Sequence, residues 1–404
     1  MPLTKSKRTA VKSAAVRIAA GMAAILISPP LASYMSKNTD VIAAVWEGEK
    51  TAVAQRASAS GRLPLSLEMN NSLLIIYRPS PTGAAGGDAE VIAEALPPLS
   101  FHEDMHETDD CDDPFNQPAA QVFSQNISDL QEEMPIFSET DGRIVKTNFG
   151  PNGGSTFLNL DKAGQVRNST ELGNDFVLAQ SRILPEIKLE LNGEPEVLIF
   201  HTHTTEAFQP CGYDYFDSSY NGRSKDSGKN IVAVGAEIAK SFAASGITVI
   251  HDGTFHDYPR FSGAYSRSAE TVRQILKAYP SIKVVLDIHR DAITGADGAR
   301  VAPVTLVNGE NAAQVMILSA ADDGTFDIPD YLQNFRLASL FQQQMEYDNP
   351  GITRPIWFQY SQFNQHIMPG SLLIEVGAHG NTLEEAKLTG RLIGRSMAAA
   401  LLSL

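Results

Sequence analysis

The chain is poor in cysteine and has no surplus of positive charge. It contains only two cysteines among 404 residues, Cys111 and Cys211. Two are too few for a disulfide-dense scaffold, and their spacing excludes a zinc site of the CxxC type. The formal net charge of −15 at pH 7 argues against nucleic acid as a partner, because no basic stripe is present to neutralise phosphates. Hydrophobic residues make up 43% of the chain, which is enough for a packed core.

The N-terminus is basic first and then apolar. Lysine and arginine occur without any acid in residues 5–17, residues 18–27 are apolar or small, and a proline pair follows at 29–30. This pattern predicts a signal anchor or signal peptide over residues 1–35, and it leaves cleavage and retention both open. With the positive flank inside, we expect a protein held at the cytoplasmic membrane by a single N-terminal anchor, with its catalytic part outside the cytoplasm.

Three further parts follow this segment. Residues 36–140 include a Pro/Gly/Ala-rich stretch and an acidic stretch, and they are expected to form an extracytoplasmic linker region that is partly disordered. Residues 141–193 read as strands and turns, which predicts a small β-rich lead-in. Residues 194–404 are expected to form the catalytic domain.

Apolar runs alternate with helical patterns in this last part. Strands are predicted near 196–200, 247–250, 282–288, 301–307, 315–319 and 371–376, and helices near 230–242, 266–279, 331–347 and from 382 onward. Such alternation predicts an α/β fold with a doubly wound, mostly parallel sheet flanked by helices.

Three of the predicted strands end in residues that bind metals or transfer protons. The first runs into His201-Thr202-His203-Thr204-Thr205-Glu206, the second into His289-Arg290-Asp291, and the third into Glu375. In open α/β sheets, ligands bind outside the carboxyl ends of the strands. A catalytic zinc needs three protein ligands and an open position, and amide hydrolysis also needs a general base. His203 and His289 are therefore predicted as ligands and Glu375 as the base.

The third ligand is less obvious from the residues alone. Asp226 precedes the first predicted helix, where it would face the strand ends, although an acid there also suits the helix dipole. Arg290 is a further candidate for the catalytic site, with pairing to Asp291 as the alternative. Glu206 is the first alternative to Glu375 as the base.

Several strings in the chain match a known family. These are Val197-Leu198-Ile199-Phe200-His201-Thr202-His203-Thr204-Thr205-Glu206, Lys229-Asn230-Ile231-Val232-Ala233-Val234-Gly235, Ala264-Tyr265-Ser266-Arg267-Ser268, Asp287-Ile288-His289-Arg290-Asp291 and Glu375-Val376-Gly377. In this order, over about residues 180–404, they make the chain resemble stage II sporulation protein P.

The resemblance implies an amidase-like fold and a Zn²⁺ cofactor. It implies cleavage of the bond between the glycan and the stem peptide of peptidoglycan, and also cleavage of peptide cross-links. Carried over from the zinc N-acetylmuramoyl-L-alanine amidases, the ligands are His203, Asp226 and His289 and the base is Glu375. His201 and Glu206 belong to the sporulation-type motif and are alternatives to Asp226 as ligands. The implied partners are stage II sporulation proteins D and M, during engulfment of the forespore.

Two other functions stay open at this point. One is an amidase for daughter-cell separation, which no residue of the sequence distinguishes from a sporulation enzyme. The other is a non-catalytic module that binds the cell wall on an amidase-like fold. A binding module has no need for a general base, so the presence of Glu375 beside two histidine motifs favours an enzyme.

Overall fold

The computed structural model describes residues 74–79, 90–94 and 142–404, all within one compact unit. The helices are α4 (Asn174–Ser181), α5 (Ile231–Ala244), α6 (Ala264–Ala278), α7 (Tyr331–Asp348) and α8 (Leu383–Leu402). The strands are β1 (Leu74–Arg78), β2 (Glu90–Glu94), β3 (Gly142–Thr147), β4 (Phe157–Asn159), β5 (Gln165–Asn168), β6 (Val197–Phe200), β7 (Tyr215–Phe216), β8 (Val249–Asp252), β9 (Val284–Asp291), β10 (Arg300–Val307), β11 (Glu310–Ala313), β12 (Val315–Ala321), β13 (Ile356–Tyr360) and β14 (Ser371–Ala378).

A ten-stranded sheet forms the centre of this unit, in the order β2-β1-β8-β6-β9-β14-β12-β13-β5-β4. Its central strands β8, β6, β9 and β14 are parallel to one another. Strand β12 is antiparallel to β14 and parallel to β13. The starts of β12 and β13 therefore lie at the same edge of the sheet as the ends of β6, β9 and β14.

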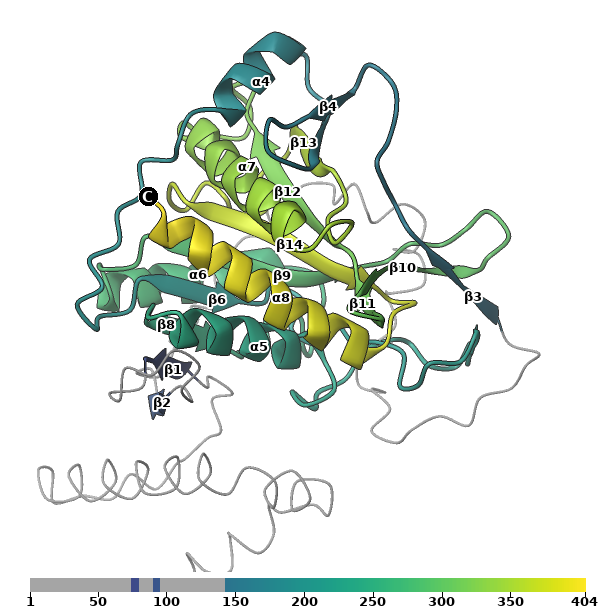
Figure 1. Ribbon diagram of the computed structural model, residues 1–404. Coiled ribbons are helices and arrows are strands. Elements are labelled where there is room, and N and C mark those ends of the chain that lie inside the picture. The colour runs from purple at the N-terminus through teal and green to yellow at the C-terminus, as the bar shows by residue number, and fades with distance from the viewer. Residues whose placement is uncertain (1–73, 80–89, 95–141) are drawn as a thin grey trace, which may run out of the picture. The chain divides into compact units, whose positions relative to one another are not determined.

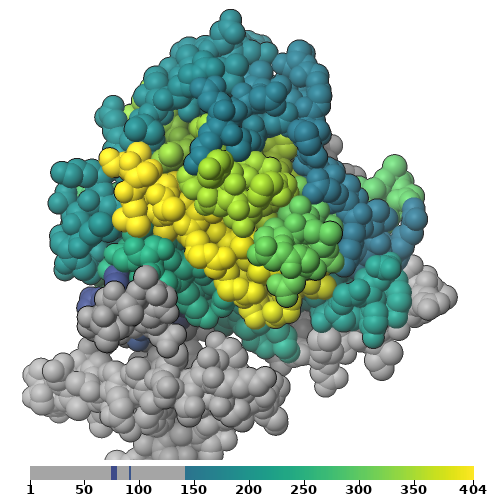
Figure 2. Space-filling view, in the orientation of Figure 1, coloured from purple at the N-terminus to yellow at the C-terminus, as the bar shows by residue number. Residues whose placement is uncertain are grey.

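Helices cover both faces of the sheet. On one face, α5, α8 and α7 lie side by side (Figure 1), and Figure 2 shows the yellow surface of α8 between α7 and α5. Ile199 of β6 packs on that side with Ile238 of α5, whereas Phe200 packs on the opposite side with Val272 of α6. Because side chains alternate along a strand, a strand buried on both faces must be apolar throughout, which explains the continuous apolar runs in the sequence.

Local signals fix where two of the helices begin. The side chain of Asn230 accepts a hydrogen bond from the backbone N–H of Val232, which starts α5. Thr382 and Glu385 form a capping box at the start of α8, in which each side chain bonds to the other's backbone N–H. Both helices thus begin at the carboxyl edge of the sheet and run back across it.

The predicted fold class is confirmed, since a large, centrally parallel sheet lies between helices. The prediction missed strand β13, a short segment with no polar alternation. The predicted strand near 301–307 exists as β10, but it belongs to a separate four-stranded sheet, in the order β11-β10-β3-β7.

The predicted domain boundaries stay a prediction. Strands β1 and β2 come from the predicted linker 36–140, and β1 pairs with β8 of the large sheet. Strands β4 and β5 come from the predicted lead-in 141–193, and β5 pairs with β13 at the other end of that sheet.

The prediction of a single N-terminal membrane anchor needs correction. Within residues 74–79, 90–94 and 142–404, no helix has the length and apolar character that crossing a membrane requires. The anchor is therefore not supported, and the location at the cytoplasmic membrane that rested on it is withdrawn. The segment from which it was predicted, residues 1–35, lies outside the described residues.

Candidate metal centre and active site

Two histidines and a glutamate meet where β6 and β9 end. His203 and Glu206 come from the loop after β6, and His289 lies near the end of β9. One oxygen of the Glu206 carboxylate is 3.4 Å from Nδ1 of His203, and the other is 3.6 Å from Nδ1 of His289. One ligand atom from each residue lies within 4.8 Å of the other two, and all three side chains are buried. This arrangement brings together donors that suit a divalent metal ion.

Glu375 lies next to this cluster on the neighbouring strand. It is the register partner of His289 in the parallel pair of β14 and β9, so both side chains point to the same face of the sheet. Its Oε2 is buried and has no hydrogen-bond partner among the described residues. Burial raises the pKa of Glu375 well above its usual range, and the nearby Asp291 carboxylate raises it further.

His289 is held by a carboxylate on its far side. Its Nε2 lies 2.8 Å from Oδ1 of Asp287, which leaves Nδ1 facing Glu206. Asp287 also accepts hydrogen bonds from the backbone N–H of Thr202 at 2.8 Å and from its hydroxyl at 2.6 Å. A carboxylate that orients the second nitrogen of a ligand histidine is a common feature of zinc sites.

The electrostatics of the cluster also favour a cation. Burial lowers the pKa of His289, but Asp287 and Glu206 outweigh burial and raise that pKa to about 10. Burial raises the pKa of Glu206, but His203, His289 and Arg290 together hold it well below its usual range. Glu206 is therefore ionised at neutral pH and can serve as an anionic ligand. The excess of carboxylates around His289 is what a divalent cation would balance, so these residues fit a zinc ion.

The loop that carries His203 and Glu206 is held by a buried carboxylate, that of Asp257. The buried carboxylate of Asp257 accepts hydrogen bonds from the backbone N–H and the hydroxyl of Thr205 and from Nη1 of Arg223 at 2.6 Å. The aromatic ring of Phe261 also stacks on the imidazole ring of His203, with the ring centroids 4.6 Å apart. The buried Arg223–Asp257 ion pair and the ring of Phe261 thus both hold this loop in place.

Two predicted ligands lie outside the cluster. Asp226 is half exposed, accepts a hydrogen bond from the backbone N–H of Gly228, and pairs with Lys229. His201 is buried against α5, where its Nε2 lies 2.9 Å from Nε2 of His251. Gly235 of α5 leaves the space that these two rings occupy, since a Cβ there would come within 2.7 Å of both. The turn that follows β6 therefore directs His201 toward α5 and away from His203 and His289.

Arg290 connects loops through its side chain. Its Nε and Nη2 donate to the backbone carbonyls of Ala207 and Gly222, and its backbone N–H donates to Glu206. The alternative, an ion pair with Asp291, is not what the structure contains: the Asp291 carboxylate accepts a hydrogen bond from Nη1 of Arg354 at 2.7 Å. Arg290 therefore holds in place the loop that runs from Glu206 to Gly222.

Sequence reasoning did not single out Asp287, Asp257 or Arg354. Asp287 carried a usable signal, because an acid within an apolar strand must be paired or functional. Asp257 and Arg354 carried none, because they lie in loops and find their partners only in the folded chain.

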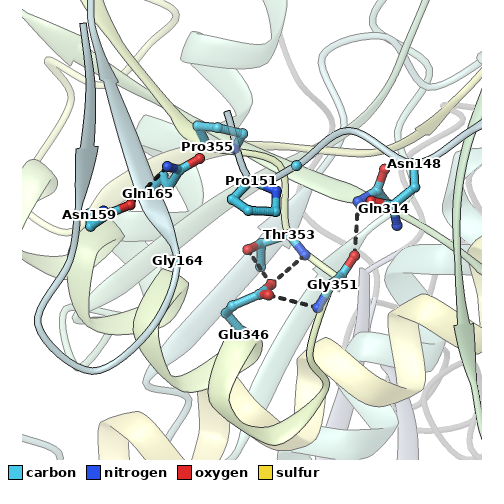
Figure 3. A pocket seen from close by; sticks show the side chains of 11 residues that line it. Asn148, Pro151, Asn159, Gly164, Gln165, Gln314, Glu346, Gly351, Thr353 and Pro355 are labelled. Carbon is cyan, nitrogen blue, oxygen red and sulfur yellow. Dashed lines mark hydrogen bonds between the residues drawn. The ribbon is translucent and has the colours of Figure 1, made fainter. Parts of the chain in front are cut away.

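A pocket of about 270 Å³ lies elsewhere in the described part of the chain (Figure 3), lined by none of the predicted site residues. Its polar groups are satisfied internally. The Glu346 carboxylate accepts hydrogen bonds from the backbone of Gly351 and Thr353, and Gln314 donates to the carbonyl of Gly351. These bonds join two loops, so the pocket has a structural explanation.

The solved structures that are similar to this chain include three amidases. N-acetylmuramoyl-L-alanine amidase AmiC2 of Nostoc punctiforme is 11% identical, with a TM-score of 0.28, and the match covers 52% of this chain and 96% of that chain. N-acetylmuramoyl-L-alanine amidase of Clostridium difficile 630 is 16% identical, with a TM-score of 0.29, and the match covers 52% of this chain and 96% of that chain. The CwlD amidase of Clostridioides difficile, solved in complex with the GerS lipoprotein, is 13% identical, with a TM-score of 0.29, and the match covers 51% of this chain and 94% of that chain.

No curated protein matches the chain. The family model of stage II sporulation protein P (SpoIIP) matches residues 124–398, which is more than half of the chain and includes every residue of the cluster. The predicted resemblance is therefore confirmed, and the chain belongs to the stage II sporulation protein P family.

Proposed function

We propose that this chain is a zinc-dependent peptidoglycan hydrolase of the N-acetylmuramoyl-L-alanine amidase type, acting in sporulation during forespore engulfment. The observation that carries the proposal is the buried cluster of His203, Glu206 and His289 with Glu375 beside it on the adjacent strand. Membership of the sporulation family supports the biological setting.

We assign the metal to His203, Glu206 and His289. Glu206 takes the place first predicted for Asp226, because it lies between the two imidazole rings whereas Asp226 is half exposed and paired with Lys229. A zinc ion held by these residues would act as a Lewis acid toward the amide carbonyl and the attacking water.

Glu375 is assigned the proton transfers. Hydrolysis adds water across the amide: the water oxygen bonds to the carbonyl carbon, the C–N bond breaks, and the nitrogen leaves as an amine. Glu375 accepts a proton from the water and passes it to that nitrogen, an assistance worth roughly 10²–10⁴-fold in rate. Its buried position on β14, paired in register with His289, places this carboxylate beside the proposed metal site, where both proton transfers occur.

Membership of the family supports the proposed substrate and partners. We propose cleavage of the bond between the glycan and the stem peptide, together with cleavage of peptide cross-links, and we propose stage II sporulation proteins D and M as partners. Co-purification of tagged full-length protein with each of these two proteins tests the partners independently of the chemistry.

The test of the ligand set compares two conservative variants. Purified full-length chain should contain about one zinc per molecule and should digest purified peptidoglycan, releasing new peptide amino termini. Glu206→Gln should lose zinc and activity, because an amide is a poor replacement for an ionised ligand. Asp226→Asn is the matched control and should keep both.

Two results would contradict these assignments. Loss of zinc in Asp226→Asn with zinc retained in Glu206→Gln would return the ligand role to Asp226. Tight binding to peptidoglycan without release of amino termini, in zinc-loaded wild-type protein, would instead support a wall-binding module.

A further inference from the structure

A buried arginine with at least three of its five side-chain N–H donors unpaired among the described residues lies at the same edge of the sheet as the cluster. Arg354 is 6% exposed and comes just before β13, where its backbone N–H donates to the carbonyl of Val315 at the start of β12. Its Nη1 donates to the carboxylate of Asp291 at 2.7 Å. Its Nε and Nη2 have no hydrogen-bond partner among the described residues. Buried donors without acceptors are unfavourable, and a bound ligand with acceptor oxygens would remove that penalty.

The position of Arg354 connects it to the proposed catalytic carboxylate. Asp291 follows His289 by two residues in β9, so both point to the same face, and Glu375 is the partner of His289 on β14. Through its bond to Asp291, Arg354 therefore lies at the strand ends that carry His289 and Glu375.

The two free nitrogens form a specific recognition edge. Nε and Nη2 lie along one edge of the planar guanidinium group and can hold both oxygens of one carboxylate. Arg182 shows this geometry in the same chain, where its Nε and Nη2 each lie 2.9 Å from an oxygen of Asp161. In Arg354 the corresponding edge is unused, because the bond to Asp291 is made through Nη1.

We propose that Arg354 binds a free carboxylate of the peptide part of the substrate, next to the bond that is cut. The proposal rests on the proposed amidase function of the site and specifies its substrate class: a stem peptide with free carboxylates rather than a neutral one. The paired, planar acceptor oxygens of a carboxylate match the unused edge of Arg354, whereas a carboxamide offers only one acceptor.

The test measures discrimination between two small substrates. N-acetylmuramoyl-L-alanyl-D-glutamate carries free carboxylates, and its analogue has both glutamate carboxylates converted to carboxamides. Zinc-loaded wild-type protein should cleave the acid with a kcat/KM roughly 10- to 100-fold above that of the carboxamide, the range expected for hydrogen bonds to a charged group.

Three variants assign this preference to Arg354. Arg354→Gln should lose it, and Arg354→Lys, which keeps the charge beside Asp291 but not the two-pronged edge, should keep only a small part. Arg182→Lys is the matched control at an exposed carboxylate pair and should keep the full preference. Because each value is a ratio of two substrates on one protein sample, a partly unfolded variant does not distort it.

A binding measurement separates this inference from the proposed function. Calorimetry on the Glu375→Gln variant should show tighter binding of the acid than of the carboxamide, whether or not the wild-type chain hydrolyses either. Equal binding, or a preference that survives Arg354→Gln, would overturn the role of Arg354. Absence of hydrolysis together with preserved binding preference would refute the hydrolase proposal and leave the carboxylate site standing.

Discussion

Asp287→Asn is expected to weaken zinc binding without disturbing the fold. The Asp287 carboxylate faces Nε2 of His289 at 2.8 Å on one side and Thr202 on the other. Asparagine has the same size, and its carbonyl oxygen can keep the contacts to His289 and to the Thr202 backbone. Its NH₂ group can donate to the Thr202 hydroxyl, which in turn can donate to Ser268, 2.7 Å away. The substitution therefore removes a charge and little else.

The size of the effect follows from the role of that charge. Burial raises the pKa of Asp287, but His289 and Thr202 outweigh burial and lower it, so the native side chain is ionised. An anionic partner makes the His289 imidazole a better donor to a metal and fixes which nitrogen faces Glu206. Loss of such a partner lowers metal affinity by about 10- to 100-fold, or roughly 1.4–2.7 kcal/mol.

The assay is competition for zinc against a chromophoric chelator, with thermal melting of the metal-free proteins as a check on folding. Asp252→Asn is the matched control, because Asp252 is equally buried on β8 and bonds to Thr254, away from the cluster. It should bind zinc as the wild type does. If Asp287→Asn keeps wild-type zinc affinity, Asp287 does not orient a ligand, and His289 loses its place in the metal site.

Three further predictions concern the base, the loop and a buried histidine. Glu375→Gln should keep zinc and the melting temperature but lose roughly 10²–10⁴-fold in the rate of peptidoglycan digestion. Asp257→Ala removes the acceptor for Thr205 and breaks the buried ion pair with Arg223; chemical denaturation should show a loss of roughly 3–5 kcal/mol in the free energy of unfolding. Burial, with nearby arginines, lowers the pKa of His379 well below its usual value, so the unfolded chain takes up a proton below about pH 6.5 that the folded chain does not. Stability should therefore fall as the pH decreases through that range, and less so in His379→Gln.

Controls for these predictions use the same chain. Asp161→Ala breaks an exposed pair with Arg182 and should change stability little, in contrast to Asp257→Ala. A wild-type rate in Glu375→Gln would place the base elsewhere, and an unchanged free energy of unfolding in Asp257→Ala would mean that the Arg223 pair does not stabilise the loop. An identical pH dependence in His379→Gln and wild type would assign the acid sensitivity to other groups.

The sequence by itself determined the fold class and most of the strands and helices near the site. Strands such as β6 had to be apolar on both faces, and helix α8 carried its own capping box at Thr382 and Glu385. These are local signals, because each depends on residues adjacent in the chain. The placement of His203, His289 and Glu375 at strand ends was readable for the same reason, since an abrupt change from apolar to ionisable residues marks the end of a buried strand.

Only the tertiary structure decided which of the remaining candidates approach one another. Glu206 and Asp226 are both acids that follow β6, and nothing in their spacing showed that the loop would turn Glu206 between two imidazoles and leave Asp226 beside Lys229. His201 and His203 differ by two positions, yet the turn after β6 sends one toward α5 and the other toward His289. The Arg354–Asp291 pair joins residues 63 positions apart. Such contacts depend on how strands pair and loops cross in three dimensions, and no periodicity in the chain records them.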